Sequence, residues 1–106
     1  MAWIVLFIAG LLEIVWSVAM KQSDGFTRLA PSVLSVTAMI GSVVALAFAM
    51  RTLPLGTAYT VWTGIGAVGA FAVGIVFLGE AASALRLAAA TLIVAGLVLM
   101  KVASPG

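Results

Sequence analysis

Four long runs of apolar residues make up most of this sequence, and short polar segments separate them. Two of the runs, residues 29–50 and 57–78, hold 22 residues each without a charged side chain. In a helix, 22 residues at about 1.5 Å of rise each reach roughly 33 Å, and the hydrocarbon core of a bilayer is about 30 Å thick. Both runs are therefore predicted to be transmembrane helices.

The first and the last run each contain charge. Residues 3–20 are apolar except for Glu13, and no positively charged segment precedes them, so we expect a helix rather than a cleaved signal peptide. The last run is long enough only if it includes Arg86, whose long side chain can reach the headgroups. The pattern predicts an all-α membrane protein, a single domain of residues 1–106, with spans at about 3–20, 29–50, 57–78 and 81–101.

The links between the runs are short. Residues 21–25 end in an Asp-Gly pair, residues 51–57 contain Pro54 and Gly56, and Gly79 follows the third run. Links of this length make neighbouring helices run antiparallel.

The composition excludes several classes of protein. Hydrophobic residues make up 65% and charged residues 8%, against roughly 45–50% and about 25% in soluble domains. A soluble enzyme, a disordered chain and a nucleic-acid-binding protein are all excluded by this balance. There is no Cys and no His, so thiolate metal sites and histidine-based catalysis are excluded too. We expect no enzyme activity, no metal and no cofactor.

The basic residues divide almost evenly between the two membrane faces. Arg51 and Lys101 fall on the face of the N-terminus, and Lys21, Arg28 and Arg86 fall on the other. Two against three is too even to set one orientation by the positive-inside rule. Either another signal sets the orientation, or the chain inserts both ways and pairs with itself antiparallel.

Glu13 is the candidate functional residue. It lies inside the first span, where an ionised acid costs about 2.5–3.5 kcal/mol on insertion scales. Every basic residue lies at a predicted helix end or in a link, so none reaches the same depth. The carboxyl is then either protonated or paired with a cation from outside the chain. A site that exchanges these two states is a proton/cation exchanger; the alternative is a permanently neutral acid that hydrogen-bonds between helices.

Residues three and four positions from Glu13 share its helix face. They include Gly10, Trp16 and Ser17. A deep indole N–H needs a partner, and aromatic faces beside a carboxylate suit a desolvated cation.

Tyr59, Trp62 and Thr63 share a face in the third span, and Gly66 follows one turn later. Tyr59, near the start of the span, is equally compatible with an interfacial aromatic belt. The glycines of this span indicate either close packing or a hinge.

Small residues recur along the second span at helical spacing: Ser35, Ala38, Ser42, Ala45 and Ala49. Such a stripe allows close helix packing. Ser42 lies mid-span, where its hydroxyl either orients the Glu13 carboxylate or bonds its own helix. Leu85, Leu92 and Leu99 recur every seven residues in the fourth span, which we assign to assembly. One small bundle leaves little room for a pathway, so a transporter of this length needs a second copy.

Several motifs together resemble those of the small multidrug resistance family of bacterial inner-membrane exporters. They are Leu-Glu-Ile-Val-Trp at 12–16, Gly-Phe-Thr-Arg-Leu at 25–29, Leu-Pro-Leu-Gly-Thr-Ala-Tyr at 53–59 and Val-Trp-Thr-Gly-Ile-Gly at 61–66. Within the family, Trp16 after the glutamate, with Ser42 and the Trp-Thr-Gly-Ile-Gly string, is similar to the guanidinium-exporter branch. The other branch, which exports quaternary ammonium compounds, usually has a small residue at this position.

The resemblance implies an antiparallel, dual-topology homodimer, multi-pass in the inner membrane and in contact with its lipid, that exports guanidinium in exchange for protons by alternating access. It implies that Glu13 is the shared proton and substrate site and that Trp16, Ser42, Tyr59 and Trp62 line it. From the shared helix faces we expect Gly10, Ser17 and Thr63 to support this site. No cofactor is expected, because the proton gradient drives transport.

Three alternatives stay open. One is an exporter of quaternary ammonium and polyaromatic cations with the same fold. The second is a non-transporting membrane assembly subunit, in which Glu13 is structural. The third, a proton-conducting ring subunit, also has one buried acid, but four spans and flanking aromatic residues disfavour it.

Overall fold

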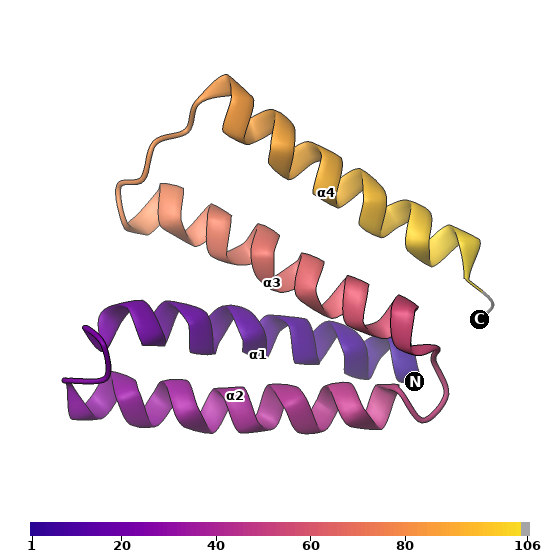
Figure 1. The fold of residues 1–106 in the computed structure, drawn as a ribbon, viewed down its shortest axis with the longest axis horizontal. Helices are drawn as coiled ribbons and strands as arrows, with labels where there is room; N and C mark the ends of the chain where they lie inside the picture. The colour runs from indigo at the N-terminus through magenta and orange to yellow at the C-terminus, as the bar shows by residue number, and fades with distance from the viewer. Residues whose placement is uncertain (105–106) are drawn as a thin grey trace.

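The computed structural model describes residues 1–104 and consists of four α-helices joined by short links (Figure 1). The helices are α1 (Ala2–Gln22), α2 (Leu29–Ala49), α3 (Leu55–Phe77) and α4 (Ala84–Ala103). Each is long and apolar enough to cross a membrane, as predicted. The expected domain of residues 1–106 includes two residues, 105–106, that lie outside the described part.

The fourth helix starts at Ala84, three residues later than the pattern placed it, because the link before it has a folded geometry of its own. Gly79 has a φ of +71°, which an L-residue with a side chain rarely adopts. The Ser83 side chain then caps α4 by accepting the Arg86 backbone N–H at 3.2 Å. Residues 81–83 therefore belong to the link, and the apolar alanines there gave no signal of this.

Helices α1 and α2 pack antiparallel and form the most extensive helix pair. The predicted small-residue stripe of α2 faces α1, and Ser35, Ala38, Ser42 and Ala49 are buried there. Two serines tie the helices together. Ser35 donates to the Trp16 carbonyl at 2.8 Å, and Ser42 donates to the Ala9 carbonyl at 2.7 Å. Both serines and both carbonyls are seven residues apart, so the two bonds set one register.

Helix α3 crosses α1 obliquely and meets it through glycines (Figure 1). Gly10 of α1 receives the side chain of Ile65, and Gly69 of α3 receives the side chain of Ile14. Helix α3 runs without interruption through its glycines. These contacts give the glycines a packing role, which was one of the two alternatives.

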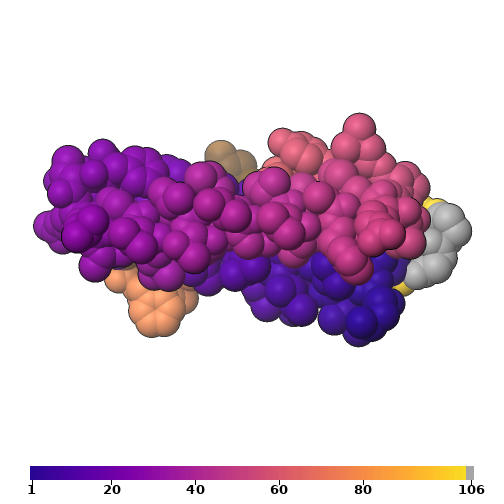
Figure 2. Space-filling view, turned by 90° about the horizontal axis from the view of Figure 1, so that it is seen from below, coloured from indigo at the N-terminus to yellow at the C-terminus, as the bar shows by residue number. Residues whose placement is uncertain are grey.

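Helix α4 packs mainly on α3, where Leu97 fills the space above Gly64, and near its C-terminal end Lys101 lies over the Trp3 ring of α1. No residue of α4 is buried, and Leu85, Leu92 and Leu99 are 82%, 73% and 67% exposed. The described chain is therefore a thin slab of 42 × 34 × 16 Å rather than a closed bundle (Figures 1 and 2). Its core is a small cluster around Leu6 and Leu46, where α1, α2 and α3 meet.

Candidate functional site

Glu13 lies in the middle of α1 with its carboxyl group against the backbone of α3. A Cβ atom built on Gly66 would lie 2.7 Å from Glu13 Cδ and 2.9 Å from Oε2, so a side chain at residue 66 would collide with the acid in this position. Glu13 Oε2 is buried and has no hydrogen-bond partner among residues 1–104. A buried acceptor without a partner costs about 1–3 kcal/mol, so this oxygen is available to a proton or to a donor from outside the chain.

No cation of the described chain compensates Glu13. The one ion pair within residues 1–104 joins Glu80 and Arg86 at 3.5 Å, in the link before α4. Lys21 and Lys101 occupy the last turns of α1 and α4, far along the helices from Glu13. The acid inside the membrane span therefore has no compensating charge among residues 1–104.

The indole of Trp16 lies on the neighbouring turn of α1. Its Nε1 is buried and, like Glu13 Oε2, has no hydrogen-bond partner in the described part of the chain. Its backbone carbonyl accepts the Ser35 hydroxyl, which holds this turn of α1 against α2. Glu13 and Trp16 thus present a free acceptor and a free donor three residues apart.

Ser42 connects three helices. Trp62 of α3 donates its indole N–H to Ser42 Oγ at 2.9 Å, and Ser42 donates onward to the Ala9 carbonyl of α1 at 2.7 Å. The Tyr59 ring packs on Trp62 with centroids 5.5 Å apart, and Tyr59 is half exposed. Ser42 therefore orients the Trp62 indole; the structure shows it bonded to neither Glu13 nor its own helix, the two roles that the sequence suggested.

The three supporting residues are placed differently. Gly10 packs against Ile65, one turn before Glu13. Ser17 donates to the Ile14 carbonyl of its own helix at 2.9 Å. Thr63 lines a groove between α3 and α4 together with Tyr59. Gly66 contacts the acid and Trp16 lies three residues from it on α1, whereas Tyr59, Trp62 and Ser42 form a second group joined to α1 through Ala9.

Two contributors were not among the predicted site residues. The Ala9 carbonyl anchors Ser42, and Gly66 holds the Glu13 carboxyl. A backbone carbonyl leaves no mark in the sequence. The role of Gly66 did have a signal in the sequence, because this glycine lies four residues after Trp62 on the same helix face.

Comparison with known proteins covers nearly the whole chain. Residues 1–93 match the family model described as Small Multidrug Resistance protein. A protein named guanidinium exporter from Escherichia coli strain K12 is 60% identical over 104 residues, which are 98% of this chain and 99% of that protein. Proteins of the same name from Citrobacter freundii and Salmonella typhimurium are each 59% identical over the same length and coverage.

Proposed function

This chain belongs to the small multidrug resistance family, and we propose that it exports guanidinium in exchange for protons at Glu13. It is a multi-pass protein of the bacterial membrane and a transporter rather than an enzyme. The observation that carries the proposal is the buried Glu13 oxygen, which lies inside a membrane span without a partner in residues 1–104. The high identity to proteins named guanidinium exporter supports the choice of substrate.

Guanidinium fits the chemistry of this site. It is planar, and its N–H donors form a fork that a carboxylate accepts two at a time, as it does with arginine. The faces of Trp16, Trp62 and Tyr59 offer cation–π contacts, each worth roughly 0.5–2 kcal/mol. A proton and a guanidinium ion compete for the same Glu13 oxygens, so each leaves when the other binds. Alternating access to this one site couples their movements.

An antiparallel, dual-topology homodimer is the second part of the proposal. Support comes from α4, which packs mainly on α3 and leaves its leucine row exposed. It also comes from the charge distribution: Arg51 and Lys101 lie at one end of the helices, and Lys21, Arg28 and Arg86 lie at the other. Two copies in opposite orientations would pair two Glu13 sites around one midplane, as inverted repeats do in larger transporters.

The Glu13→Gln variant tests this function. Glutamine is nearly the same size but neither binds nor releases a proton, so proton-driven guanidinium uptake into proteoliposomes should fall to background. The matched control is Glu80→Gln, because Glu80 lies in the link before α4 and pairs with Arg86. We expect this control to transport at the wild-type rate. Full proton-coupled exchange by Glu13→Gln would refute the proposal and favour a structural role for the acid.

A panel of substrates separates guanidinium export from export of quaternary ammonium compounds. Currents on a solid-supported membrane are measured with guanidinium and with tetrapropylammonium across pH. We expect current with guanidinium that depends on Glu13. Current with tetrapropylammonium alone would place this chain with the other branch.

A further inference from the structure

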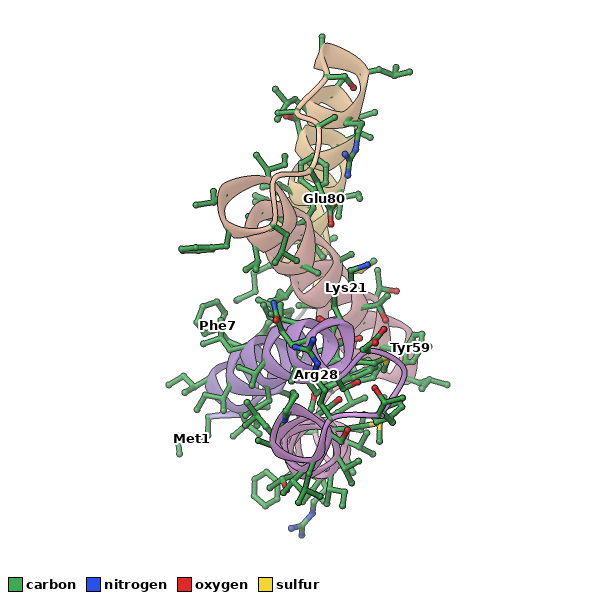
Figure 3. All side chains as sticks on the ribbon, turned by 90° about the vertical axis from the view of Figure 1, so that its left-hand side faces the viewer. Met1, Phe7, Lys21, Arg28, Tyr59 and Glu80 are labelled. Carbon is green, nitrogen blue, oxygen red and sulfur yellow. The ribbon has the colours of Figure 1, made fainter. Side chains whose placement is uncertain are left out.

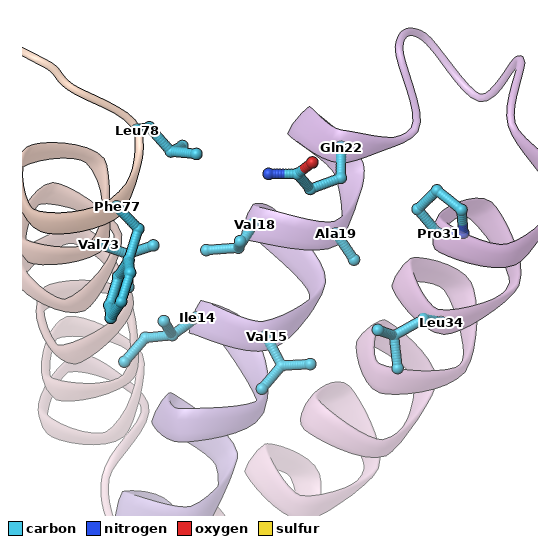
Figure 4. Close-up of a pocket in the computed structure, with 10 residues that line it drawn as sticks. All are labelled: Ile14, Val15, Val18, Ala19, Gln22, Pro31, Leu34, Val73, Phe77 and Leu78. Carbon is cyan, nitrogen blue, oxygen red and sulfur yellow. The ribbon is translucent and has the colours of Figure 1, made fainter.

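Two hollows adjoin each other beside the C-terminal half of α1. The first is an apolar groove of about 470 Å³, with α1 as its floor and α2 and α3 on either side (Figure 4). The second is a cavity of about 570 Å³ at the end of the helices, lined by the charged residues Lys21, Asp24, Arg28 and Glu80. Gln22 and Leu78 line both, so the polar cavity opens into the apolar groove.

The groove lies on the opposite side of α1 from Glu13. Val15, Val18 and Gln22 line it, and they follow Glu13 by two, five and nine residues. At 3.6 residues per turn, these positions are rotated about 200°, 140° and 180° from the acid. The groove is therefore separate from the proposed transport site.

The two hollows together have the shape of an amphiphile. The groove runs from Gln22, at the end of α1, inward to Ile14, which is about 12 Å along the helix at 1.5 Å per residue. Its lining side chains are apolar except for Gln22 (Figure 4). The polar cavity lies at the helix ends, which in a membrane is the level of the headgroups. A ligand that fits both parts has a charged head and an apolar tail.

The charges of the cavity define the head. In the described chain, Lys21 and Arg28 have no carboxylate within 4 Å. Asp24 has no basic side chain within the same distance. Glu80 pairs instead with Arg86 at 3.5 Å. Figure 3 faces this end of the molecule and shows Lys21 between Arg28 and Glu80 in that view. Two unpaired cations beside one unpaired carboxylate complement a phosphate that carries a nearby ammonium group.

We propose that these hollows bind one phospholipid with a primary-amine headgroup. Lys21 and Arg28 hold the phosphate by charge-assisted hydrogen bonds, and Asp24 accepts the ammonium N–H. One acyl chain lies in the groove over Val18, between the start of α2 and the end of α3. The lipid thereby supports the half of α3 that diverges from α1 (Figure 1).

Native mass spectrometry of the full-length protein tests this proposal. The protein is released from nanodiscs that contain equal parts of phosphatidylethanolamine, phosphatidylglycerol and phosphatidylcholine, and the retained lipid is identified. We expect one phosphatidylethanolamine per chain. Lys21→Gln and Arg28→Gln should each lower its retention about fivefold, the effect of one basic residue near the membrane surface. Asp24→Asn should remove the preference for the amine, and asparagine tolerates the φ of +51° at this position.

The tail is tested by filling the groove. Val18→Trp should displace the acyl chain and lower retention, whereas Val76→Trp, at an exposed valine of α3 outside the groove, should not. Arg51→Gln, at the other end of the helices, is the matched control for the loss of charge. Equal retention of the three lipids, preferential retention of phosphatidylglycerol or phosphatidylcholine, or equal losses in Arg51→Gln and Arg28→Gln would overturn the proposal.

Discussion

The contact between Glu13 and Gly66 places the acid of the proposed site. The carboxyl atoms occupy the space that a side chain at residue 66 would need, so the position of the acid depends on a missing methyl group in another helix. The presence or absence of one carbon atom at residue 66 therefore decides where the Glu13 carboxyl group can lie.

Gly66→Ala should therefore impair transport while leaving the fold intact. The added Cβ would meet the flexible end of Glu13, which can move aside at little cost to stability. A shift of about 1 Å costs a well-positioned group up to about 100-fold in activity, and we expect guanidinium transport to fall at least about tenfold. Proteoliposome uptake measures this. Gly96→Ala is the control, because a Cβ there has nothing within 4 Å; equal effects of both variants would argue against the contact.

Ser42→Ala should disturb both the aromatic group and the helix pair. It removes the acceptor of the Trp62 indole and the donor to Ala9, and hydrogen bonds between membrane helices are worth about 0.6 kcal/mol each. We expect a loss of about 1 kcal/mol of stability in detergent unfolding, together with weaker guanidinium binding. Thr91→Ala, whose hydroxyl bonds its own helix at Leu87, should change neither quantity. Wild-type binding by Ser42→Ala would show that the orientation of Trp62 does not matter to the site.

At the level of helices, α3 is the central element. Its glycines admit Glu13 and Ile14 from α1 on one side and Leu97 from α4 on another. These glycines let α1 and α4 each bring a side chain close to the α3 backbone. Membrane helices gain little from hydrophobic burial against each other, so close packing of this kind holds the arrangement.

Gly64→Ala should destabilise the chain through Leu97. Its Cβ would lie 3.0 Å from Leu97 Cγ, and overpacking of this kind costs about 1–3 kcal/mol. Adding Leu97→Ala removes the side chain that the new Cβ meets. The double variant should therefore lose less stability than the two single variants together, by about 0.5 kcal/mol or more. Steric-trap unfolding measures the cycle. Gly64→Ala with Leu92→Ala, at an exposed leucine, should be additive; additivity in both pairs would contradict this packing.

At the level of the whole molecule, the isolated chain is incomplete as a bundle. It is 16 Å thick in its shortest direction, and α4 buries none of its residues. Lipid can cover such a face as well as protein can. The proposal that a second, inverted copy covers it rests on the nearly even charges at the two ends.

Charge variants test the inverted pair. At present three basic residues lie at the end with Lys21 and two lie at the end with Arg51. Ala81→Lys changes this count to four against two, and Thr52→Lys combined with Arg86→Gln reverses it to two against three. Since basic residues set orientation, each variant should insert mainly one way, which accessibility labelling of added cysteines reports. Each alone should lose guanidinium efflux from cells, and co-expression should restore it. Full efflux by either variant inserted in one orientation would exclude the antiparallel dimer.

Much of this architecture was predictable from the sequence. The four helices and the membrane setting follow from long uncharged runs, because a bilayer tolerates few other backbones. The α2 stripe predicted a packing face, and Ser35 and Ser42 are buried there. Glu13 was identifiable as the candidate site because a lone acid among apolar residues is energetically costly.

Other features depended on the three-dimensional arrangement. Whether Ser42 meets Glu13, its own helix or Trp62 depends on the rotation of α2 against α1 and α3, and the same stripe of small residues is compatible with several rotations. The late start of α4 depends on hydrogen bonds in the preceding link. The position of Glu13 against Gly66 depends on the crossing of α1 and α3. Local pattern determines which residues enter the bilayer, because transfer from water is a property of each segment; which side chains meet there is decided by packing between segments far apart in the sequence.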